Sequence, residues 1–483
     1  MKAIKILFLV LLLSVNSHAH ANYNDNKIPM SLSECIEMAL SQSTQLKIKR
    51  SELELSELEL EKEISIFDPV IWSNAKSVRG NSRAISILDG VEFNKQDRLF
   101  MDLGVTKQFD IGTKFDIWTK TNYIDTNIVT QIYNPMFNSE FMVALRQPIL
   151  SGAGKISTEY KIELAKINIR IQTNEYKDML NEVKSDVKKA YLKFAYCYDN
   201  MRIASEMLVI AKSIREIARH KLEAGELSRV DLSRFEESVL GEEVTYLEIV
   251  KMFNESEILL KRSMNNHMSK SRFIPYDEYK PLTINYTVDY AYQNGLNRNH
   301  EYYRQQKEIE KKKISLRAAK AGNKPVLNAV LEAGINGTEH TFADSYSKMG
   351  NAGQHSWTIG LEFAVPVGNR EAESIYKEAV IDLSKEQLKL DNFENDFYSD
   401  IAVRVNQILS FNDKIEKMYK LDTLANARLK AIEVKFRRGM ASNSDILDIL
   451  YEMKKIKTEL SKMIFENNLA VIEINRLIGE END

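Results

Sequence analysis

Apolar positions recur at helical spacing over two very long stretches, residues 155–224 and 370–438, and neither stretch contains glycine or proline. At about 1.5 Å per residue, each stretch predicts a helix roughly 100 Å long. A heptad series of mostly small residues marks a seam along the first helix, where neighbouring helices can approach closely. The series is Val183, Ala190, Cys197, Ala204, Ala211 and Ala218.

The same short turn follows each long helix. Both turns place a glycine, a serine and an aspartate three residues apart: Gly225, Ser228 and Asp231 in the first, Gly439, Ser442 and Asp445 in the second. A second helical pattern follows each turn, over 230–264 and 444–478. The chain is therefore predicted to make the same helix–turn–helix twice.

Between the helical stretches the apolar period changes to two, which is typical of strands. The expected strands are 70–79, 99–109, 113–123, 141–150, 326–336 and 355–367. The last of them has a fully apolar face, formed by Trp357, Ile359, Leu361, Phe363 and Val365, and a polar or small one. This pattern is typical of a strand between lipid and a water-filled lumen. Taken alone, it fits a strand over a soluble core equally well.

The whole order of elements is duplicated. Residues 40–69 align without a gap on residues 296–325, and each copy ends in a proline that stops a helix. Between its strands the first copy is longer by about 40 residues (69–148 against 325–366). This extra hairpin could add strands to the sheet or form a flap around residues 80–97.

The N-terminus has the pattern of a secretory signal peptide: Lys2 and Lys5, an apolar run over 6–13, and a cleavage site after Ala19 or Ala21. The expected organisation follows from the duplication. It comprises the signal peptide (1–21), the leading helices of the first repeat (22–69), the first strand segment with its extra hairpin (70–150), the first long helical hairpin (151–265), a connector (266–298), the leading helix of the second repeat (299–325), the second β-hairpin (326–367) and the second long helical hairpin (368–483).

Charge and composition exclude several classes. With 66 basic and 69 acidic side chains the net charge is −3, which argues against a nucleic-acid-binding surface. After the signal peptide no stretch approaches the ~20 apolar residues of a membrane helix, so any membrane part must consist of strands. The two cysteines, Cys35 and Cys197, could form a disulfide, but Cys197 fits better as a small packing residue in the heptad seam.

No catalytic or metal-binding motif is found. The segment 152–155, Gly-Ala-Gly-Lys, hints at a phosphate loop, but Ile149 stands where the first glycine is needed and Ile156 replaces the magnesium-binding Ser or Thr. The histidines show no metal-ligand spacing. We therefore expect neither an enzyme nor a cofactor or metal site.

Four main strands per chain, or six with the extra hairpin, are too few to close a barrel around a lumen. An open strand edge is not tolerated in a bilayer, because its backbone groups would lack hydrogen-bond partners. If the strands lie in a membrane, several copies of the chain must pool them.

The signal peptide, the duplication, the strand exits 147–150 and 364–367 and the Gly-x-x-Ser-x-x-Asp turns together resemble the TolC family of outer-membrane efflux proteins. This resemblance implies a mainly α fold in which long hairpins form a periplasmic α-helical barrel and the strands form a transmembrane β-barrel in a homotrimer. It also implies docking to a periplasmic adaptor and to an inner-membrane pump or ABC exporter, as in tripartite efflux or type I secretion.

The resemblance places both turns at the periplasmic tip, where acidic residues of the last helix ring a closed entrance. Asp445 and Asp448 match that spacing. Six carboxylates around a narrow mouth would favour cations, and their repulsion would raise the carboxyl pKa values. The alternative is that Asp445, like Asp231, is only a helix cap.

The family's closed form also holds a tyrosine and an arginine on this turn, where the present chain has Phe436 and Ala441. Closure is then expected to be weaker or to depend on other residues, with Arg437 and Arg438 as candidates. The glycines and serines of the two turns are the expected adaptor-docking groove. The competing reading of the whole chain is a soluble periplasmic coiled-coil scaffold or adaptor.

Overall fold

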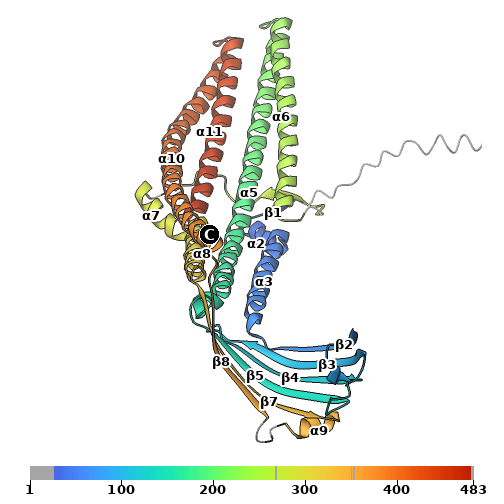
Figure 1. The fold of residues 1–483 in the computed structure, drawn as a ribbon. Helices are drawn as coiled ribbons and strands as arrows, with labels where there is room; N and C mark the ends of the chain where they lie inside the picture. Colours follow the sequence, from blue (N-terminus) through green and yellow to red (C-terminus); the bar gives the residue numbers. More distant parts are fainter. Residues whose placement is uncertain (1–26, 267–268, 285, 350, 352–353, 480–483) are drawn as a thin grey trace, which may run out of the picture. The chain divides into compact units, whose positions relative to one another are not determined.

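The computed structural model describes residues 27–266, 269–284, 286–349, 351 and 354–479, so the expected signal peptide lies outside the described residues. The chain divides into two compact units. The first unit contains the described residues up to 44, 180–288 and 401–479, and the second contains 45–179 and 289–400. The long helices α5 (Tyr160–Glu223) and α10 (Arg370–Arg437) contribute to both (Figure 1).

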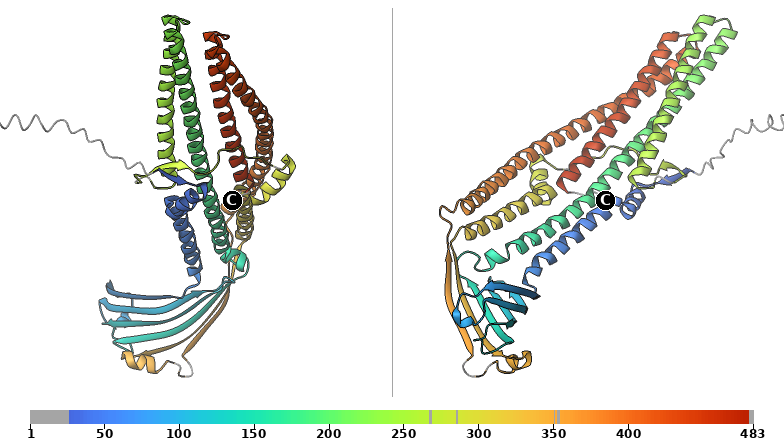
Figure 2. Two further views of the ribbon diagram at one scale, coloured as in Figure 1. Left: turned by 180° about the vertical axis from the view of Figure 1, so that it is seen from behind. Right: turned by 45° about the vertical axis from the view of Figure 1, so that its right-hand side comes forward.

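The first unit is built from two long helical hairpins. Helix α6 (Arg229–Ser263) returns along α5, and α11 (Asn443–Ile478) returns along α10 (Figures 1 and 2). Their apolar stripes meet in one core that draws residues from all four helices. Its buried members are Ile203, Met207, Ile214, Ala218, Phe235, Ala425, Leu429, Phe436, Ile446, Ile449, Leu450 and Met453.

A short parallel strand pair also belongs to the first unit, and the sequence pattern did not predict it. Strand β1 (Lys27–Met30) pairs with β6 (Arg272–Pro275), which lies within the expected connector 266–298. Helix α2 (Leu32–Gln42) follows β1 and begins with a capping box formed by Ser31 and Glu34. Four-residue strands are too short for their alternation to stand out in a sequence.

The second unit holds a six-stranded antiparallel sheet, and all six expected strands are present (Figure 1). The strands are β2 (Val70–Arg83), β3 (Phe93–Gln108), β4 (Lys114–Thr126), β5 (Met136–Pro148), β7 (Val326–Glu339) and β8 (His355–Ala364). Their order in the sheet is the order in the sequence, with β2 and β8 at the edges. The extra hairpin of the first repeat therefore adds strands to the sheet.

Several strands are longer than the alternation indicated. The segment 80–97, named above as a possible flap, contains the end of β2 and the start of β3, separated by a short 3-10 helix, η2 (Ile87–Asp89). Backbone pairing continues through these polar residues, where no apolar face remains to reveal it. At the other end of the sheet, β8 stops at Ala364, so the expected strand to 367 was too long.

Besides the parts of α5 and α10 that lie in it, the second unit contains several further helices. They include α3 (Thr44–Ile64), α4 (Lys155–Thr158), α7 (Val288–Arg298) and α8 (His300–Gly322), and the 3-10 helix η1 (Ser65–Phe67) follows α3. The helix expected to run unbroken from residue 155 is interrupted at Glu159. The Thr158 hydroxyl donates to the carbonyl of Asp110 in the β3–β4 turn, which holds this first helical turn against the sheet.

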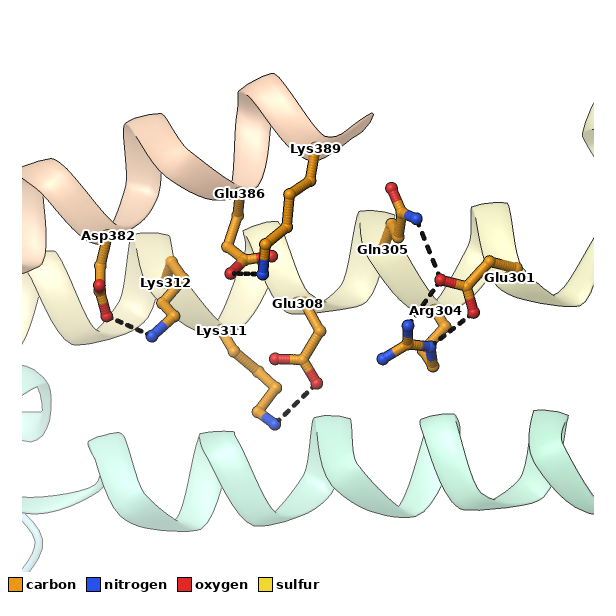
Figure 3. A network of polar contacts seen from close by, with 9 residues as sticks. All are labelled: Glu301, Arg304, Gln305, Glu308, Lys311, Lys312, Asp382, Glu386 and Lys389. Carbon is orange, nitrogen blue, oxygen red and sulfur yellow. Dashed lines mark hydrogen bonds and ion pairs between the residues drawn. The ribbon is translucent and has the colours of Figure 1, made fainter. Parts of the chain in front are cut away.

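Charged side chains on α8 and α10 pair mostly within their own helix (Figure 3). Arg304 bonds Glu301 at 2.6 Å, Lys311 bonds Glu308 at 3.0 Å and Lys389 bonds Glu386 at 2.8 Å. In this group only Lys312 reaches the other helix, where it pairs with Asp382. Most of these side chains are half-buried, and local pairs of this kind contribute little each to stability.

One short helix, α9 (Phe342–Ser347), follows β7 and packs on the end of the sheet (Figures 1 and 2). The Tyr346 hydroxyl lies 2.9 Å from the hydroxyls of both Thr119 and Thr121. The Ser345 hydroxyl lies 2.8 Å from that of Ser139, and both serines are fully buried. The sequence did not predict α9, because polar contacts with the sheet hold this helix in place and it has no apolar period.

Candidate functional site

The first hairpin turn ends α5 and starts α6 with two linked caps. Gly225 has a φ of +74°, a left-handed conformation that favours glycine. It lets the Glu226 amide donate to the Lys221 carbonyl at 2.8 Å, closing a Schellman motif. Ser228 is the N-cap of α6, and its hydroxyl accepts from the Asp231 amide at 3.1 Å.

The second turn has the same construction, as the repeated sequence frame predicts. Gly439 has a φ of +73°, and the Met440 amide donates to the Lys435 carbonyl at 2.8 Å. Ser442 is the N-cap of α11. The Asp445 amide donates to the Ser442 hydroxyl at 3.1 Å, and the Ser442 amide donates to the Asp445 carboxylate at 2.8 Å. Asp445 is therefore the third residue of a capping box.

The two acidic residues expected at the gate have different local roles. The hydrogen bonds from the backbone and hydroxyl of Ser442 hold the pKa of Asp445 below its ordinary range. Asp448 lies one turn later, exposed, and takes no part in the cap. The expected rise in pKa concerns carboxylates of different copies, so it stays a prediction for the assembled ring.

Phe436 occupies a buried position between the two hairpins. It is only 2% exposed, and its ring centroid lies 5.6 Å from that of Phe235. The ammonium of Lys221 lies 5.4 Å above the same ring. Ala441, in the place of the arginine, packs against the same core. An apolar and cation–π contact therefore stands where a hydrogen-bonding tyrosine would be expected.

Within the described residues of the single chain, neither candidate arginine forms an ion pair or a side-chain hydrogen bond between the hairpins, and their part in closing an assembled entrance stays a prediction. Arg437 pairs with Glu433 at 2.7 Å within its own helix, and Arg438 is exposed. The sequence reasoning missed the residues that do make the contact, which include Lys221, Phe235 and Asn443. The pKa of Asp231 is lowered chiefly by the hydrogen bond from the Ser228 hydroxyl, and a hydrogen bond from the Asn443 side chain lowers it further.

A charged contact also joins the two hairpins farther from the turns. The Lys454 ammonium lies 3.0 Å from both carboxylate oxygens of Glu242 and 3.3 Å from the Thr245 hydroxyl. The side chains of Lys454 and Glu242 are 27% and 18% exposed, so this pair is partly shielded from water. The sequence did not predict this pair, because Lys454 and Glu242 are two of many charged residues on the helices.

The sheet has one apolar and one charged face. On β8 the expected apolar side chains Trp357, Ile359, Leu361 and Phe363 are 64–72% exposed, while Val365 lies one residue beyond the strand. The strand register continues this apolar face across the sheet. Its other members include Leu327, Leu331 and Ile335 on β7, Phe141, Val143 and Leu145 on β5, and Leu99, Leu103 and Val105 on β3.

On the opposite, charged face, side chains of opposite charge lie beside one another on neighbouring strands. Lys120 on β4 stands between Asp102 and Glu140 of the neighbouring strands, and Arg146 pairs with Glu362 at 3.3 Å. On β7 the apolar face runs from Leu327 to Ile335, about 27 Å along the strand. That length fits the ~25 Å apolar band of an outer-membrane strand.

Aromatic side chains gather where the apolar face ends. Tyr123 and Phe137 have ring centroids 5.0 Å apart, and Phe342 and Tyr346 of α9 extend the cluster. Aromatic girdles of this kind mark the interfaces of membrane strands.

No described helix combines the length and hydropathy needed to cross a bilayer. Within the described residues, no three His, Cys, Asp or Glu side chains gather closely enough to hold a metal ion.

Comparison of the sequence with models of protein families and with curated proteins found no match. Comparison with solved structures found proteins whose fold matches most of this chain. The outer-membrane channel OprN aligns with a TM-score of 0.67 at 12% identity, covering 93% of this chain and 90% of that one.

Two further channels agree. The outer membrane protein VceC of Vibrio cholerae aligns with a TM-score of 0.67 at 14% identity, covering 93% of this chain and 97% of that one. The outer membrane channel CmeC of Campylobacter jejuni gives 0.67 at 13% identity, with 96% and 88% covered. The resemblance is thereby confirmed for the fold of the single chain, which is that of the solved outer-membrane channels.

Proposed function

We propose that this protein is the outer-membrane exit duct of an export system and passes solutes or proteins passively to the outside. The observation that carries the proposal is the sheet with two different faces. One face is apolar and exposed, and its length matches the height of the apolar band of an outer-membrane strand; the other face is charged. Lipid would cover the first face and water the second. The energy for export would come from a partner, since the duct itself only offers a path.

The proposed assembly is a homotrimer in the outer membrane, with the helical part in the periplasm. Its support is the open sheet, because β2 and β8 leave edge backbone groups unpaired beside an apolar surface. Pooling the strands of several copies satisfies those groups. The likeness to solved outer-membrane channels supports the same arrangement.

The proposed partners are a periplasmic adaptor and an inner-membrane pump or ABC exporter. The docking groove is formed by the two turns around Gly225 and Gly439, with Ser228, Asp231 and Ser442. A Cβ added at Gly225 meets no atom within 4 Å, so a side chain there would point into free space that an adaptor could use.

Bulky substitutions at the turns test this groove, provided that backbone strain is controlled. Gly225→Leu is expected to abolish export, whereas Gly225→Ala measures the strain of a positive φ alone and Gly225→Asn tolerates that φ better. Export would be scored in cells beside the amount of trimer in the membrane. Normal export by Gly225→Leu and Gly439→Leu would remove the turns from the docking surface.

The direct test of the duct is single-channel conductance of purified protein in a planar bilayer. Wild type is compared with Asp445→Asn/Asp448→Asn at low and then high calcium. Small, cation-selective currents that calcium blocks, and that the double variant frees from block, are the expected result. Channels indifferent to the substitutions would move the gate elsewhere. Folded protein that forms no channels would contradict the duct.

The alternative of a periplasmic scaffold is disfavoured by the same sheet. A scaffold in water would leave Trp357, Ile359, Leu361 and Phe363 exposed on one strand, which costs solubility. Fractionation separates the two ideas, because a scaffold would leave the membrane with salt washes.

A further inference from the structure

We propose that the assembled sheet is an eighteen-stranded barrel, built from all six strands of each of three copies, with β2 of one copy paired to β8 of the next. The inference rests on the proposed trimer and adds the size and the seam of its barrel. Its starting point is the hairpin formed by β3 and β4, which the second repeat lacks. Without that hairpin the duplicated strands alone would give four strands per chain and twelve in the trimer.

The β3–β4 hairpin is a full member of the sheet. Strand β2 pairs with β3 along its whole length, from Val70 opposite Thr106 to Arg83 opposite Phe93. Strand β4 then pairs with β3 on one side and β5 on the other. A flap on the surface would leave β2 paired to β5 instead.

Side chains on the charged face secure the hairpin further. Gly104 on β3 leaves room for the ring of Trp72 and for Trp118, since a Cβ there would lie 2.5 Å from the Trp72 ring and 2.8 Å from the Trp118 Cβ atom. The Trp72 indole donates to the Thr106 hydroxyl at 3.2 Å, and that hydroxyl donates to Asp116. Strands β2, β3 and β4 are thus joined by packing as well as by backbone bonds.

The two edges have the directions that closure needs. Six antiparallel strands leave β2 and β8 running in opposite directions. Copies that share one orientation in a membrane can therefore meet only head to tail, with β8 of one antiparallel to β2 of the next. Each joint then satisfies both open edges, and no edge remains in lipid.

The side chains of the two edges are also complementary. On the apolar face β8 presents Trp357, Ile359 and Leu361, whereas β2 presents the small Ser73, Ala75 and Ser77. On the charged face the relation reverses, because β2 carries Trp72 and Lys76 while β8 carries Thr358, Gly360 and Glu362. Apart from Ile71 on the apolar face of β2, these positions place large side chains on one edge and small ones on the other, on both faces of the sheet.

The strand number sets the width of the lumen. Barrel diameter grows roughly in proportion to strand number, so eighteen strands give a barrel about 1.5-fold wider than twelve. With strands about 4.8 Å apart and tilted by about 40°, the backbone diameter is about 36 Å. That is the porin range, in which a water-filled channel remains. The barrel then admits cargo of polypeptide size, and selection by size belongs to the helical entrance.

Electron cryo-microscopy of the full-length protein in lipid nanodiscs tests the proposal by counting strands around the barrel. The expected result is a trimer with eighteen strands. A trimer with twelve, and β3–β4 outside the wall, would overturn the barrel while leaving the export duct intact. Particles that are not trimers, or that have no closed barrel, would overturn both.

Cross-linking across the seam gives a second readout. Lys76→Cys combined with Thr358→Cys places thiols on the charged faces of β2 and β8, and a short bifunctional thiol reagent should yield a covalent ladder that ends at the trimer. The matched control is Ala144→Cys with Glu332→Cys, which are direct partners on β5 and β7 of one chain and should yield no ladder. A ladder absent from the first pair in folded trimers, scanned over Asn74, Lys76 and Val78, would contradict the seam.

Discussion

At the scale of single residues, Phe436 stands where the family resemblance implies a tyrosine, and its apolar ring holds the ends of the two hairpins together. Its ring is buried against Phe235 and under Lys221, so truncation leaves a cavity. We expect Phe436→Ala to cost about 3–5 kcal/mol of stability in this region. In a bilayer, the same variant should show more frequent opening, because the two hairpins lose the aromatic and cation–π contacts of this ring.

Hydrogen exchange of the peptides around both turns measures the local effect. Val434→Ala is the matched control, since this neighbour on the same helix is 48% exposed. Equal protection in the two variants would mean that the Phe436 ring does not join the hairpins.

Asp445 makes the start of α11 sensitive to acid. Hydrogen bonds from Ser442 keep its folded pKa below the ordinary value of 3.8, so the carboxylate stabilises the helix start above that value. The stabilisation is lost as the pH falls through the folded pKa. Protection of the first turn of α11 should therefore be complete above the ordinary value of 3.8 and decline as the pH falls below it.

Asp445→Asn should lower this protection at neutral pH and remove most of its pH dependence. Asp448→Asn removes the same charge outside the cap and should change neither. The measurement is hydrogen exchange corrected for the intrinsic rate at each pH. An unchanged pH profile in Asp445→Asn would show that the capping box does not govern this turn.

At the scale of elements, α9 depends on one close approach to the sheet. A Cβ at Gly337 would lie 2.1 Å from the Ser345 carbonyl oxygen, so Gly337→Ala must displace α9. Overpacking of this kind costs about 1–3 kcal/mol. The control is Gly360→Ala on β8, where an added Cβ meets nothing within 4 Å.

Limited proteolysis of detergent-solubilised protein reports the position of α9. Faster cleavage within 342–347 is expected for Gly337→Ala only. If both variants are cut at the wild-type rate, α9 is not held by this contact.

The sequence predicted the long helices, the turns and the six strands, because each depends on a period or on a glycine that local chemistry requires. It failed where a contact with distant residues makes the element. Helix α9 and the β1–β6 pair are too short to show a period, and the polar ends of β2 and β3 are strands only because each pairs with the other.

At the scale of the whole molecule, Lys454 and Glu242 couple the two hairpins. Lys454→Glu places two carboxylates together and should favour separation of the hairpins, while the double exchange with Glu242→Lys should restore the contact. A coupling of about 1 kcal/mol corresponds to about a fivefold change in open time. Single-channel recordings of the two single variants and the double variant measure it, and additive effects in the double variant would contradict the coupling.

The sequence predicted some residues of the candidate site and missed others, because contacts with distant residues leave no local pattern. Gly225, Ser228, Gly439 and Ser442 act through their own backbone, so their spacing alone indicated the turns. Phe436 depends on what another hairpin brings to it. The sequence could say that its ring makes no hydrogen bond, but only the fold shows Phe235 and Lys221 against it.

The two cysteines have a practical consequence. Both are free and buried, and burial raises the pKa of the Cys35 thiol to about 12 and also raises that of Cys197. Neither thiol is a ready nucleophile in the folded protein. A thiol reagent should therefore label only introduced cysteines in the folded protein. Labelling of the protein without introduced cysteines would report unfolding.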